Sequence, residues 1–167
     1  MARCIRVIYA TMDSPIGELL LVGDGVNLHG LYMQAGRKPA AVRPSWRRDD
    51  AALEPVAEQL EQYFAGSRHA FDVPLVMDGS DFERRVWRAL LDIPYGETIS
   101  YGELARRIGE PDAARGVGWA NGRNPIAVVV PCHRVIGANG KLVGYGGGLE
   151  RKRLLLELES GVTALAV

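Results

Sequence analysis

The first third of the chain alternates short apolar runs with turn residues. The runs at 5–10, 18–22 and 30–33 are short and rich in Ile, Leu and Val, which is typical of β-strands. Between the first two, Asp13-Ser-Pro-Ile-Gly17 combines a proline that fixes φ with a glycine that frees it, and Asp24-Gly25 marks the next turn. This pattern predicts a small antiparallel sheet built from consecutive strands.

A loop, a helix and one more strand are predicted to complete this first region. The stretch 35–50 contains Gly36, two prolines and five basic residues without apolar periodicity, which predicts a mobile loop. Phe71-Asp-Val-Pro-Leu75 is expected to be an edge strand, because Pro74 has no amide hydrogen to donate to a neighbour. Between them, apolar side chains recur at helical spacing until Gly66 ends the helix: Leu53, Val56, Leu60, Tyr63 and Phe64. Residues 1–78 are therefore expected to form one α/β domain.

Two capping boxes mark helix starts in the second half of the chain. In Ser80-Asp-Phe-Glu83 and in Ser100-Tyr-Gly-Glu103, the serine and glutamate side chains can each satisfy a backbone amide of the other residue. The first helix is predicted to end at Pro94-Tyr-Gly96 and the second at Gly109. Asp112 is then expected to cap a third helix that runs from Ala113 to about Ala120. Two short helices joined by a tight turn are typical of a helix-turn-helix.

A hairpin and a last helix are predicted near the end of the chain. Asn139-Gly140 stands between Val135-Ile136 and Leu142-Val143, which is a strong signal for a two-residue hairpin turn. A helix over about 149–159 would carry Leu154, Leu155 and Leu158. Short helices followed by a hairpin predict a winged helix-turn-helix domain over residues 79–167.

Composition and charge narrow the class of protein. Apolar residues make up 47% and charged residues 24%, which is ordinary for a globular domain, and no apolar run approaches the roughly 18 residues that a membrane span needs. No secretory apolar segment stands at the start, and Cys4 and Cys132 are too few for a disulfide framework, so we expect a cytoplasmic protein with reduced thiols.

The charge is zero overall but unevenly distributed. Residues 113–153 hold seven basic side chains and one acidic side chain, a net charge of +6, whereas the first 80 residues hold eight basic and ten acidic ones, a net charge of −2. A basic stretch of this size suits modest binding to a phosphate backbone, although a solvated basic surface would give the same count.

Cys132 is the candidate nucleophile. It follows Pro131 and the apolar run Ile126-Ala-Val-Val-Val130, which is predicted to be a buried strand that would hold the cysteine rigidly. His133 and Arg134 supply a base and a positive charge, and a thiolate needs such neighbours to form at neutral pH. A buried structural cysteine would fit the same residues, and cysteine hydrolases usually separate their cysteine and histidine in sequence. From residue types alone, both interpretations stay open.

Pro131-Cys-His-Arg-Val135 resembles the acceptor motif of the O6-alkylguanine-DNA alkyltransferases, also called methylated-DNA–protein-cysteine methyltransferases. The resemblance covers nearly the whole chain and is densest over residues 80–159. The further matching segments, in the family's order and spacing, are Asp13-Ser-Pro15, Phe82, Val86, Trp87, Pro94-Tyr-Gly-Glu97, Ser100-Tyr101, Ala113-Ala-Arg-Gly-Val-Gly118, Asn124-Pro125, Gly140, Tyr145 and Gly147-Gly-Leu149.

This resemblance implies a fold and an activity. Residues 1–78 would form an α/β domain similar to ribonuclease H, and residues 79–167 a winged-helix domain that binds double-stranded DNA. An alkyl group would pass from O6-alkylguanine, flipped out of the duplex, to Cys132 in a stoichiometric and irreversible reaction. Activity on O4-alkylthymine is left open. No cofactor is implied, and we expect a monomer, with cooperative binding along DNA left open.

The resemblance also assigns roles to individual catalytic residues. Cys132 would accept the alkyl group, His133 would act as its base through a water molecule, and Glu159 would orient the imidazole. Asn124 would brace the backbone of the site. Tyr101 would press on the phosphate 3′ to the lesion and help to protonate the departing guanine. Without the resemblance, Glu159 would be interpreted as a solvated carboxylate at a helix end and Asn124 as a turn residue.

Further residues are implied to contact DNA or guanine. Arg115 would enter the space that the extruded nucleotide leaves, although by itself it fits a solvent-facing helix residue. Gly146 stands where some relatives have serine, so any hydrogen bond to O6 there would come from the backbone. The other expected DNA contacts are Ala114, Gly118 and Arg123, and the other expected pocket residues are Val135, Tyr145, Gly147 and Trp119.

A structural zinc, which some family members hold in the N-terminal half, is not expected. Cys4 and His29 lie near two of the relevant positions, but Asp24 replaces a cysteine and His69 is not clearly aligned, whereas tetrahedral zinc needs four good ligands. Two other functional classes stay open. A lesion-binding protein without transfer is disfavoured by the presence of Cys132, and a thiol hydrolase or a winged-helix regulator would show itself by turnover of esters or by sequence-specific DNA binding.

Overall fold

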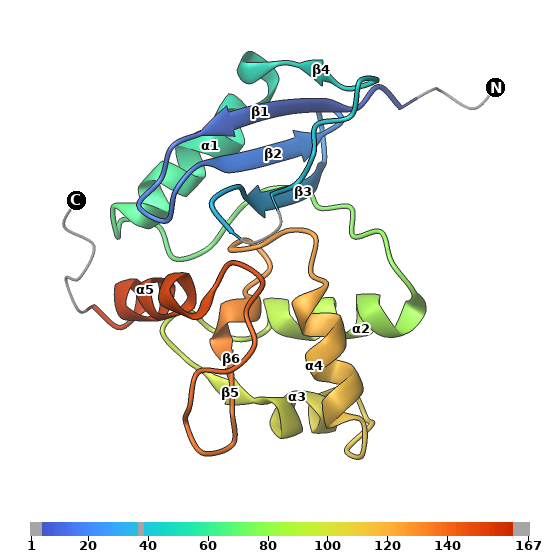
Figure 1. The fold of residues 1–167 in the computed structure, drawn as a ribbon, viewed down its shortest axis with the longest axis vertical. Coiled ribbons are helices and arrows are strands. Elements are labelled where there is room, and N and C mark those ends of the chain that lie inside the picture. The colour runs from blue at the N-terminus through green and yellow to red at the C-terminus, as the bar shows by residue number, and fades with distance from the viewer. Residues whose placement is uncertain (1–4, 37–38, 162–167) are drawn as a thin grey trace.

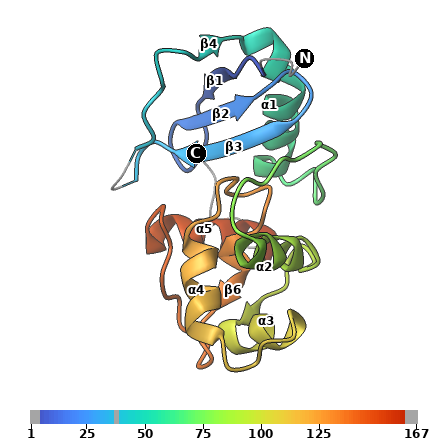
Figure 2. The same ribbon diagram turned by 90° about the vertical axis from the view of Figure 1, so that its right-hand side faces the viewer.

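The computed structural model describes residues 5–36 and 39–161. A sheet with one helix forms the N-terminal domain, and the remaining helices form the C-terminal domain below it (Figure 1). In both ribbon views β3 (Leu28–Met33) is the strand nearest to the C-terminal domain (Figure 2). The two domains therefore meet along one edge of the sheet.

The sheet has four strands in the order β3-β2-β1-β4. Strands β1 (Ile8–Met12), β2 (Leu19–Gly23) and β3 are antiparallel neighbours, as predicted, although their bounds are shifted by one to three residues. The short strand β4 (Arg47–Arg48) pairs in parallel with β1. The sheet is therefore mixed rather than antiparallel throughout, and the predicted loop 35–50 contains a strand and the start of a helix.

Helix α1 (Asp50–Phe64) packs against β1. The side chain of Asp49 accepts a hydrogen bond from the amide of Ala52 at 3.1 Å and caps the helix. All five of the apolar positions predicted to face inward are buried. The edge strand predicted at 71–75 is reduced to a single parallel bridge between Leu28 and Leu75.

The C-terminal domain begins with three short helices. The capping box of Ser80 and Glu83 opens α2 (Asp81–Leu91) as predicted. Ser100 caps α3 (Tyr101–Arg107), but the carboxylate of Glu103 pairs with Arg106 and Arg107, so only half of the second box forms. Helix α4 (Ala114–Gly122) packs against both α2 and α3. The prediction that Asp112 caps α4 is wrong, because Ala113 occupies the cap position without a side-chain bond.

The predicted hairpin is also wrong. Strand β6 (Val135–Ile136) pairs in parallel with β5 (Ile99–Ser100) and not with residues 142–143, which belong to no strand. The turn around Gly140 does form, closed by the amide of Gly137 donating to the carbonyl of Lys141 at 2.9 Å. Helix α5 (Leu149–Glu159) follows with the predicted bounds.

The segment before Cys132 is folded back on itself rather than extended. Val128 has a φ of +69°, the left-handed region that β-branched residues rarely adopt. The turn is closed by the amide of Val130, which donates to the carbonyl of Ile126 at 3.0 Å. The strand predicted over 126–130 is therefore wrong, and the cysteine begins the one-turn 3-10 helix η1 (Cys132–Arg134).

Hydrogen bonds to β3 hold this segment in place. The amide of Leu31 donates to the carbonyl of Pro125 at 2.9 Å, and the amide of Ala127 donates to the carbonyl of Leu31 at 3.2 Å. The N-terminal domain thus supports the loop that leads to Cys132.

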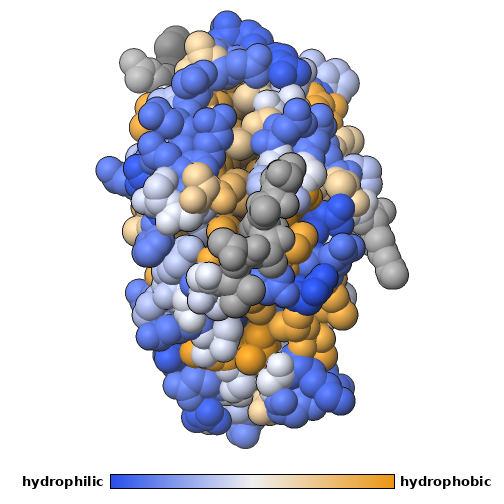
Figure 3. All heavy atoms as spheres, turned by 90° about the vertical axis from the view of Figure 1, so that its left-hand side faces the viewer, coloured by the Kyte–Doolittle hydropathy of each residue, from blue (hydrophilic) through white to orange (hydrophobic). Residues whose placement is uncertain are grey.

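The surface is unevenly polar. On the face drawn in Figure 3, hydrophilic residues cover most of the N-terminal domain, and hydrophobic residues gather in the lower part, where the C-terminal domain lies. Within the described ranges, no helix combines the length and the apolar character that crossing a bilayer requires.

Candidate active site

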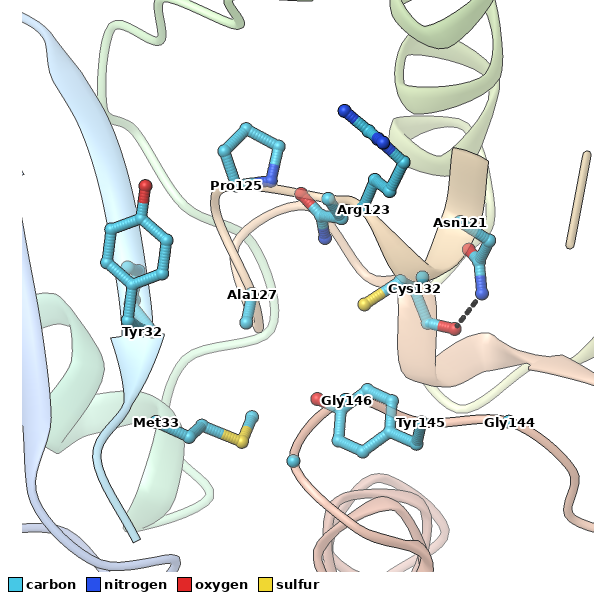
Figure 4. Close-up of a pocket in the computed structure, with 14 residues that line it drawn as sticks. Tyr32, Met33, Asn121, Arg123, Pro125, Ala127, Cys132, Gly144, Tyr145 and Gly146 are labelled. Atoms are coloured by element: carbon cyan, nitrogen blue, oxygen red, sulfur yellow. Dashed lines mark hydrogen bonds between the residues drawn. The ribbon is translucent and has the colours of Figure 1, made fainter. Parts of the chain in front are cut away.

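A cavity of about 560 Å³ opens beside Cys132 where the two domains meet. The sulfur points into this cavity, and the ring of Tyr145 lies nearby on the glycine-rich loop (Figure 4). The N-terminal domain supplies one wall through Leu31, Tyr32 and Met33 at the end of β3. The other walls come from the end of α4, the loop before Cys132 and the loop 144–147.

Three of the five expected pocket residues line this cavity, namely Tyr145, Gly146 and Gly147. Val135, which was expected to contribute backbone to the pocket, does not line this cavity, and its side chain is buried in the core. The expectation for Trp119 is wrong, since its side chain is 71% exposed on the surface of α4. The inward-facing positions of that helix are Val117, Ala120 and Asn121.

Two asparagines hold the backbone around the thiol. Asn124 donates to the carbonyl of Val130 at 2.7 Å and accepts from the amide of Ile126 at 2.9 Å, so its position fits the expected bracing role. Asn121 donates to the carbonyl of Cys132 at 3.3 Å and was not anticipated. Cys132 is only 5% exposed, and it is therefore held on a rigid and largely desolvated backbone.

Glu159 is the centre of a buried polar cluster next to the cysteine. Its Oε2 atom accepts from His133 Nε2 at 2.7 Å and from the Tyr63 hydroxyl at 2.5 Å. Arg134 binds the same carboxylate through Nε at 2.7 Å and Nη2 at 3.1 Å, and it also donates to the carbonyl of Ile93. We call Tyr63, His133, Arg134 and Glu159 the carboxylate cluster.

The charges in this cluster follow from its contacts. Burial alone would raise the pKa of Glu159, but the bonds and charges of His133 and Arg134 outweigh it and lower that pKa to about 2. Burial lowers the pKa of His133, although Glu159 opposes this shift. A neutral imidazole that donates from Nε2 to an ionised carboxylate carries its lone pair on Nδ1. That atom is buried and has no hydrogen-bond partner among the described residues, so it is available to accept a proton.

Lys152 adds a second buried positive charge that was not anticipated. Its ammonium donates to the carbonyl of Val143 at 2.9 Å, and burial lowers its pKa to about 8. Burial also raises the pKa of the Cys132 thiol, whereas Asn124 and the charge of Lys152 oppose that shift. Lys152, Leu155 and Glu159 are the buried residues of α5 and share one helix face, a spacing that could have revealed the lysine.

The residues expected at a DNA surface lie on α3, on α4 and directly after the end of α4. Arg115 is exposed and forms none of the ion pairs in the described part of the chain. Ala114 and Gly118 are half-buried, and Arg123 pairs with Glu83 at 2.9 Å. Tyr101 is half-buried, and its hydroxyl donates to the carbonyl of Val143 at 3.0 Å. To protonate a leaving group, the Tyr101 hydroxyl would have to release the carbonyl of Val143 and donate to the leaving group instead.

Most side chains of the basic stretch are bound to other groups of the protein. Arg134 and Lys152 are buried, Arg151 donates to the carbonyls of Ile16 and Gly147, and Arg153 pairs with Glu157. Within the described residues, only Arg115 and Lys141 of the seven basic side chains are exposed without an ion pair or a hydrogen bond. The net charge of +6 therefore overstates the basic surface.

The residues considered for zinc lie apart or outside the described ranges. Cys4 is outside them. His29 binds Asp24 at 2.7 Å, and the ring of His69 stacks on Tyr95 with 3.9 Å between centroids. Across residues 5–36 and 39–161, no group of three His, Cys, Asp or Glu residues is placed to hold a metal ion.

Comparisons with known proteins cover both domains. The family model described as 6-O-methylguanine DNA methyltransferase, ribonuclease-like domain, matches residues 7–77. The model described as 6-O-methylguanine DNA methyltransferase, DNA binding domain, matches residues 81–161.

Individual relatives match over nearly their whole length. A methylated-DNA–protein-cysteine methyltransferase of Mycobacterium tuberculosis is 59% identical over 152 residues, which cover 90% of this chain and 91% of the relative. One from Methanosarcina acetivorans is 52% identical over 151 residues, covering 90% and 97%. The crystal structure of Mycobacterium tuberculosis OGT in complex with DNA has a TM-score of 0.87 and 57% identity, covering 93% of this chain and 94% of that one.

Proposed function

The chain belongs to the 6-O-methylguanine DNA methyltransferase family, and from this premise we propose that it repairs DNA by moving an alkyl group from O6 of guanine to its own Cys132. The observation that carries the assignment of the acceptor is the placement of a thiol between a cavity and the carboxylate cluster. The relatives' names state the activity, and the geometry at Cys132 supplies the groups that the reaction needs.

The first step is removal of the thiol proton. Neutral His133 carries a free lone pair on Nδ1 because Glu159 holds its Nε2–H, and this nitrogen is the base for Cys132, through a bridging water. The ionised Glu159 then stabilises the imidazolium that forms. The charge of Lys152 favours the thiolate and opposes the effect of its burial.

The second step is displacement at the alkyl carbon. The Cys132 sulfur donates an electron pair to that carbon, and the bond from carbon to O6 breaks with its electrons left on guanine. A proton restores the neutral base, and Tyr101 is the proposed donor on the side of the loop 143–144. The product is a thioether, which hydrolysis does not reverse, so each protein molecule acts once.

Access to the alkyl carbon requires the nucleotide to leave the duplex. A cavity of about 560 Å³ is large enough for a purine base, and its walls carry Tyr145 and the backbone of Gly146 and Gly147. We propose that α3 and α4 form the helix-turn-helix that approaches DNA, with Arg115 filling the space of the extruded nucleotide. The small residues Ala114, Gly116 and Gly118 on α4 permit a close approach to the backbone of the duplex, as in shape-driven binding through the minor groove.

The proposal is tested by the mass of the intact protein after incubation with O6-methylguanine DNA. We expect a gain of one methyl group, located on Cys132 by peptide mapping, and no second lesion repaired per molecule. Cys132→Ala should still bind the alkylated duplex but gain no mass. A methylated alanine variant, an adduct at another residue or repeated turnover would contradict the proposed function. Turnover of an ester substrate would instead favour a thiol hydrolase.

A further inference from the structure

A hydroxyl from the N-terminal domain reaches the carboxylate cluster. Tyr63 lies in the last turn of α1 and Glu159 at the end of α5, 96 residues later in the chain. The hydroxyl of Tyr63 donates to Oε2 of Glu159 at 2.5 Å, the same oxygen that accepts the Nε2–H of His133. A charge-assisted bond of this length is among the stronger hydrogen bonds in proteins. The two domains are thus joined through the atom that holds the proposed base.

The surroundings make this contact hard to replace. Tyr63 and His133 are fully buried and Glu159 is 5% exposed, so bulk water does not compete for the carboxylate. The tyrosine ring is held by edge contacts with Phe64 and Tyr95 and by Phe71. The other donors to Oε2 of Glu159 are His133 and Arg134, which both belong to η1. Because the Tyr63 hydroxyl approaches from α1, it fixes the orientation of the carboxylate from a second direction.

We propose that Tyr63 is a positioning residue for the alkyl transfer, through which the N-terminal domain sets the orientation and basicity of Glu159 and hence the readiness of His133 to take the Cys132 proton. This inference rests on the proposed function. It assigns to the N-terminal domain a part in the chemistry in addition to its part in the wall of the cavity. Tyr63 does not touch the sulfur or the cavity, so it acts only through Glu159.

The effect on the base has a definite sign. The Tyr63 hydroxyl shares the negative charge on Oε2, which weakens the pull of that oxygen on the His133 proton. Without it, Glu159 becomes a stronger acceptor and favours the imidazolium, so the pKa of His133 rises. The reactive form carries one proton between Cys132 and His133, and a second proton on the pair blocks attack. The acid limb of the pH–rate profile therefore moves to higher pH.

The other charged and titratable groups around Glu159 do not produce this shift by themselves. Arg134 holds the carboxylate from η1, Lys152 lies on α5 itself, and Tyr95 donates to the carbonyl of Leu158 at 3.4 Å. All of them are retained when only the Tyr63 hydroxyl is removed. The change in the profile is then attributable to one hydrogen bond.

The test is Tyr63→Phe in the full chain, which keeps the ring and its packing. We expect the single-turnover rate constant for methyl transfer from O6-methylguanine DNA to fall about tenfold on the acid limb, as a rise of about one in the pKa of His133 places a second proton on the Cys132–His133 pair. The acid limb of the profile should move to higher pH. Binding of the alkylated duplex and the site of methylation should match the wild type.

Tyr95→Phe is the matched control. It removes a hydroxyl from a neighbouring ring that bonds a backbone carbonyl and not the carboxylate, so its rate and profile should equal those of the wild type. A Tyr63→Phe variant with the rate and pH profile of the wild type would overturn the proposal. A slower variant whose acid limb stays in place would overturn it as well, because loosened packing alone would have that effect. Failure of the wild type to gain a methyl group would refute the proposed function instead, independently of Tyr63.

Discussion

On one side of Cys132 lies the carboxylate cluster, four buried side chains that all bind one another through Glu159, and on the other side lies an open cavity with glycines in its walls. The first side is rigid, because every charged group has at least one partner and water is excluded. The second side is shaped by loop backbone and by residues of the other domain. The reactivity of the sulfur is therefore set by groups that do not touch the alkyl group, whereas the size of that group is limited by the cavity.

The largest expected effect comes from removing the negative charge of the carboxylate cluster. Glu159→Gln leaves Arg134 buried without its counter-charge, which should destabilise the protein by about 3–5 kcal/mol. The base loses its anionic partner, so methyl transfer should slow about a hundredfold. Urea unfolding and single-turnover transfer measure the two effects. A variant that transfers methyl at nearly the wild-type rate would show that the carboxylate is not part of the chemistry.

Acid should reduce the contribution of Glu159 to the stability of the folded protein over a defined pH range. The pKa of Glu159 in the folded protein is about 2, below its ordinary value of 4.5, so the folded state binds fewer protons than the unfolded one between these values. Its stabilising contribution is complete above about pH 4.5 and is lost as the pH falls toward 2. We expect a loss on the order of 3 kcal/mol in the free energy of unfolding. If Glu159→Gln shows the same slope as the wild type in this range, other groups cause it.

Lys152 tests whether charge beside the cavity favours the thiolate. Lys152→Met keeps a chain of similar length without the charge, so the pKa of Cys132 should rise and transfer at neutral pH should slow about tenfold. Because the pKa of Lys152 is about 8, the wild type loses the same charge at higher pH and the two rates should converge. A gap that is constant with pH would mean that the lysine acts through packing alone.

Two neighbouring glycines in the cavity wall differ in what an added methyl group would meet. A methyl group added at Gly147 would overlap the Met33 sulfur, whereas one added at Gly146 meets nothing within 4 Å. Gly147→Ala should slow transfer of a benzyl group a few-fold more than transfer of methyl. Gly146→Ala, whose methyl group meets no protein atom, should leave the position of the loop unchanged and so affect both adducts to the same extent. Equal losses for both adducts would indicate that residue 147 positions the loop and does not limit the alkyl group.

The smallest effect is expected from Trp119, which belongs neither to the carboxylate cluster nor to the cavity wall. Its indole is 71% exposed on α4, so Trp119→Ala should change the free energy of unfolding by less than about 0.5 kcal/mol. If α4 faces the duplex, affinity for DNA should fall a few-fold while transfer within the complex keeps its rate. Fluorescence anisotropy with labelled duplex separates the two quantities. An unchanged affinity would place Trp119 outside the DNA surface.

Local signals in the sequence were sufficient for most of the helices. The apolar spacing at 53–64, the capping box at Ser80 and the stripe at 149–159 each predicted a helix within a few residues, because these features act between near neighbours. The valines of 126–130 predicted a strand, yet hydrogen bonds to β3 and the left-handed Val128 give a folded loop. That contact spans about a hundred residues of sequence, and no local preference reports it.

Some residues of the candidate site could be predicted from the sequence and others could not. Cys132, His133, Asn124 and Glu159 were expected from the family resemblance, and the described residues bring them together. Tyr63 was predicted only as a helix core residue, because nothing near it in sequence indicates a carboxylate partner 96 residues away. For the basic stretch 113–153, the sequence predicted more exposed positive charge than the structure has. A sum of charges cannot distinguish an exposed arginine from one that is buried against Glu159.

The turn at Val128 depends on contacts between the two domains. A valine in the left-handed region is destabilised by about 1–3 kcal/mol, and it stays there because neighbouring structure holds it. Part of that support is the pair of backbone hydrogen bonds between Leu31 and residues 125 and 127. A fragment cut after residue 78 would lose this edge, and the loop would relax toward the extended form that its valines prefer. We expect the Cys132 sulfur to lose its fixed orientation toward the cavity in such a fragment, so that alkyl transfer depends on a domain that does not itself carry the nucleophile.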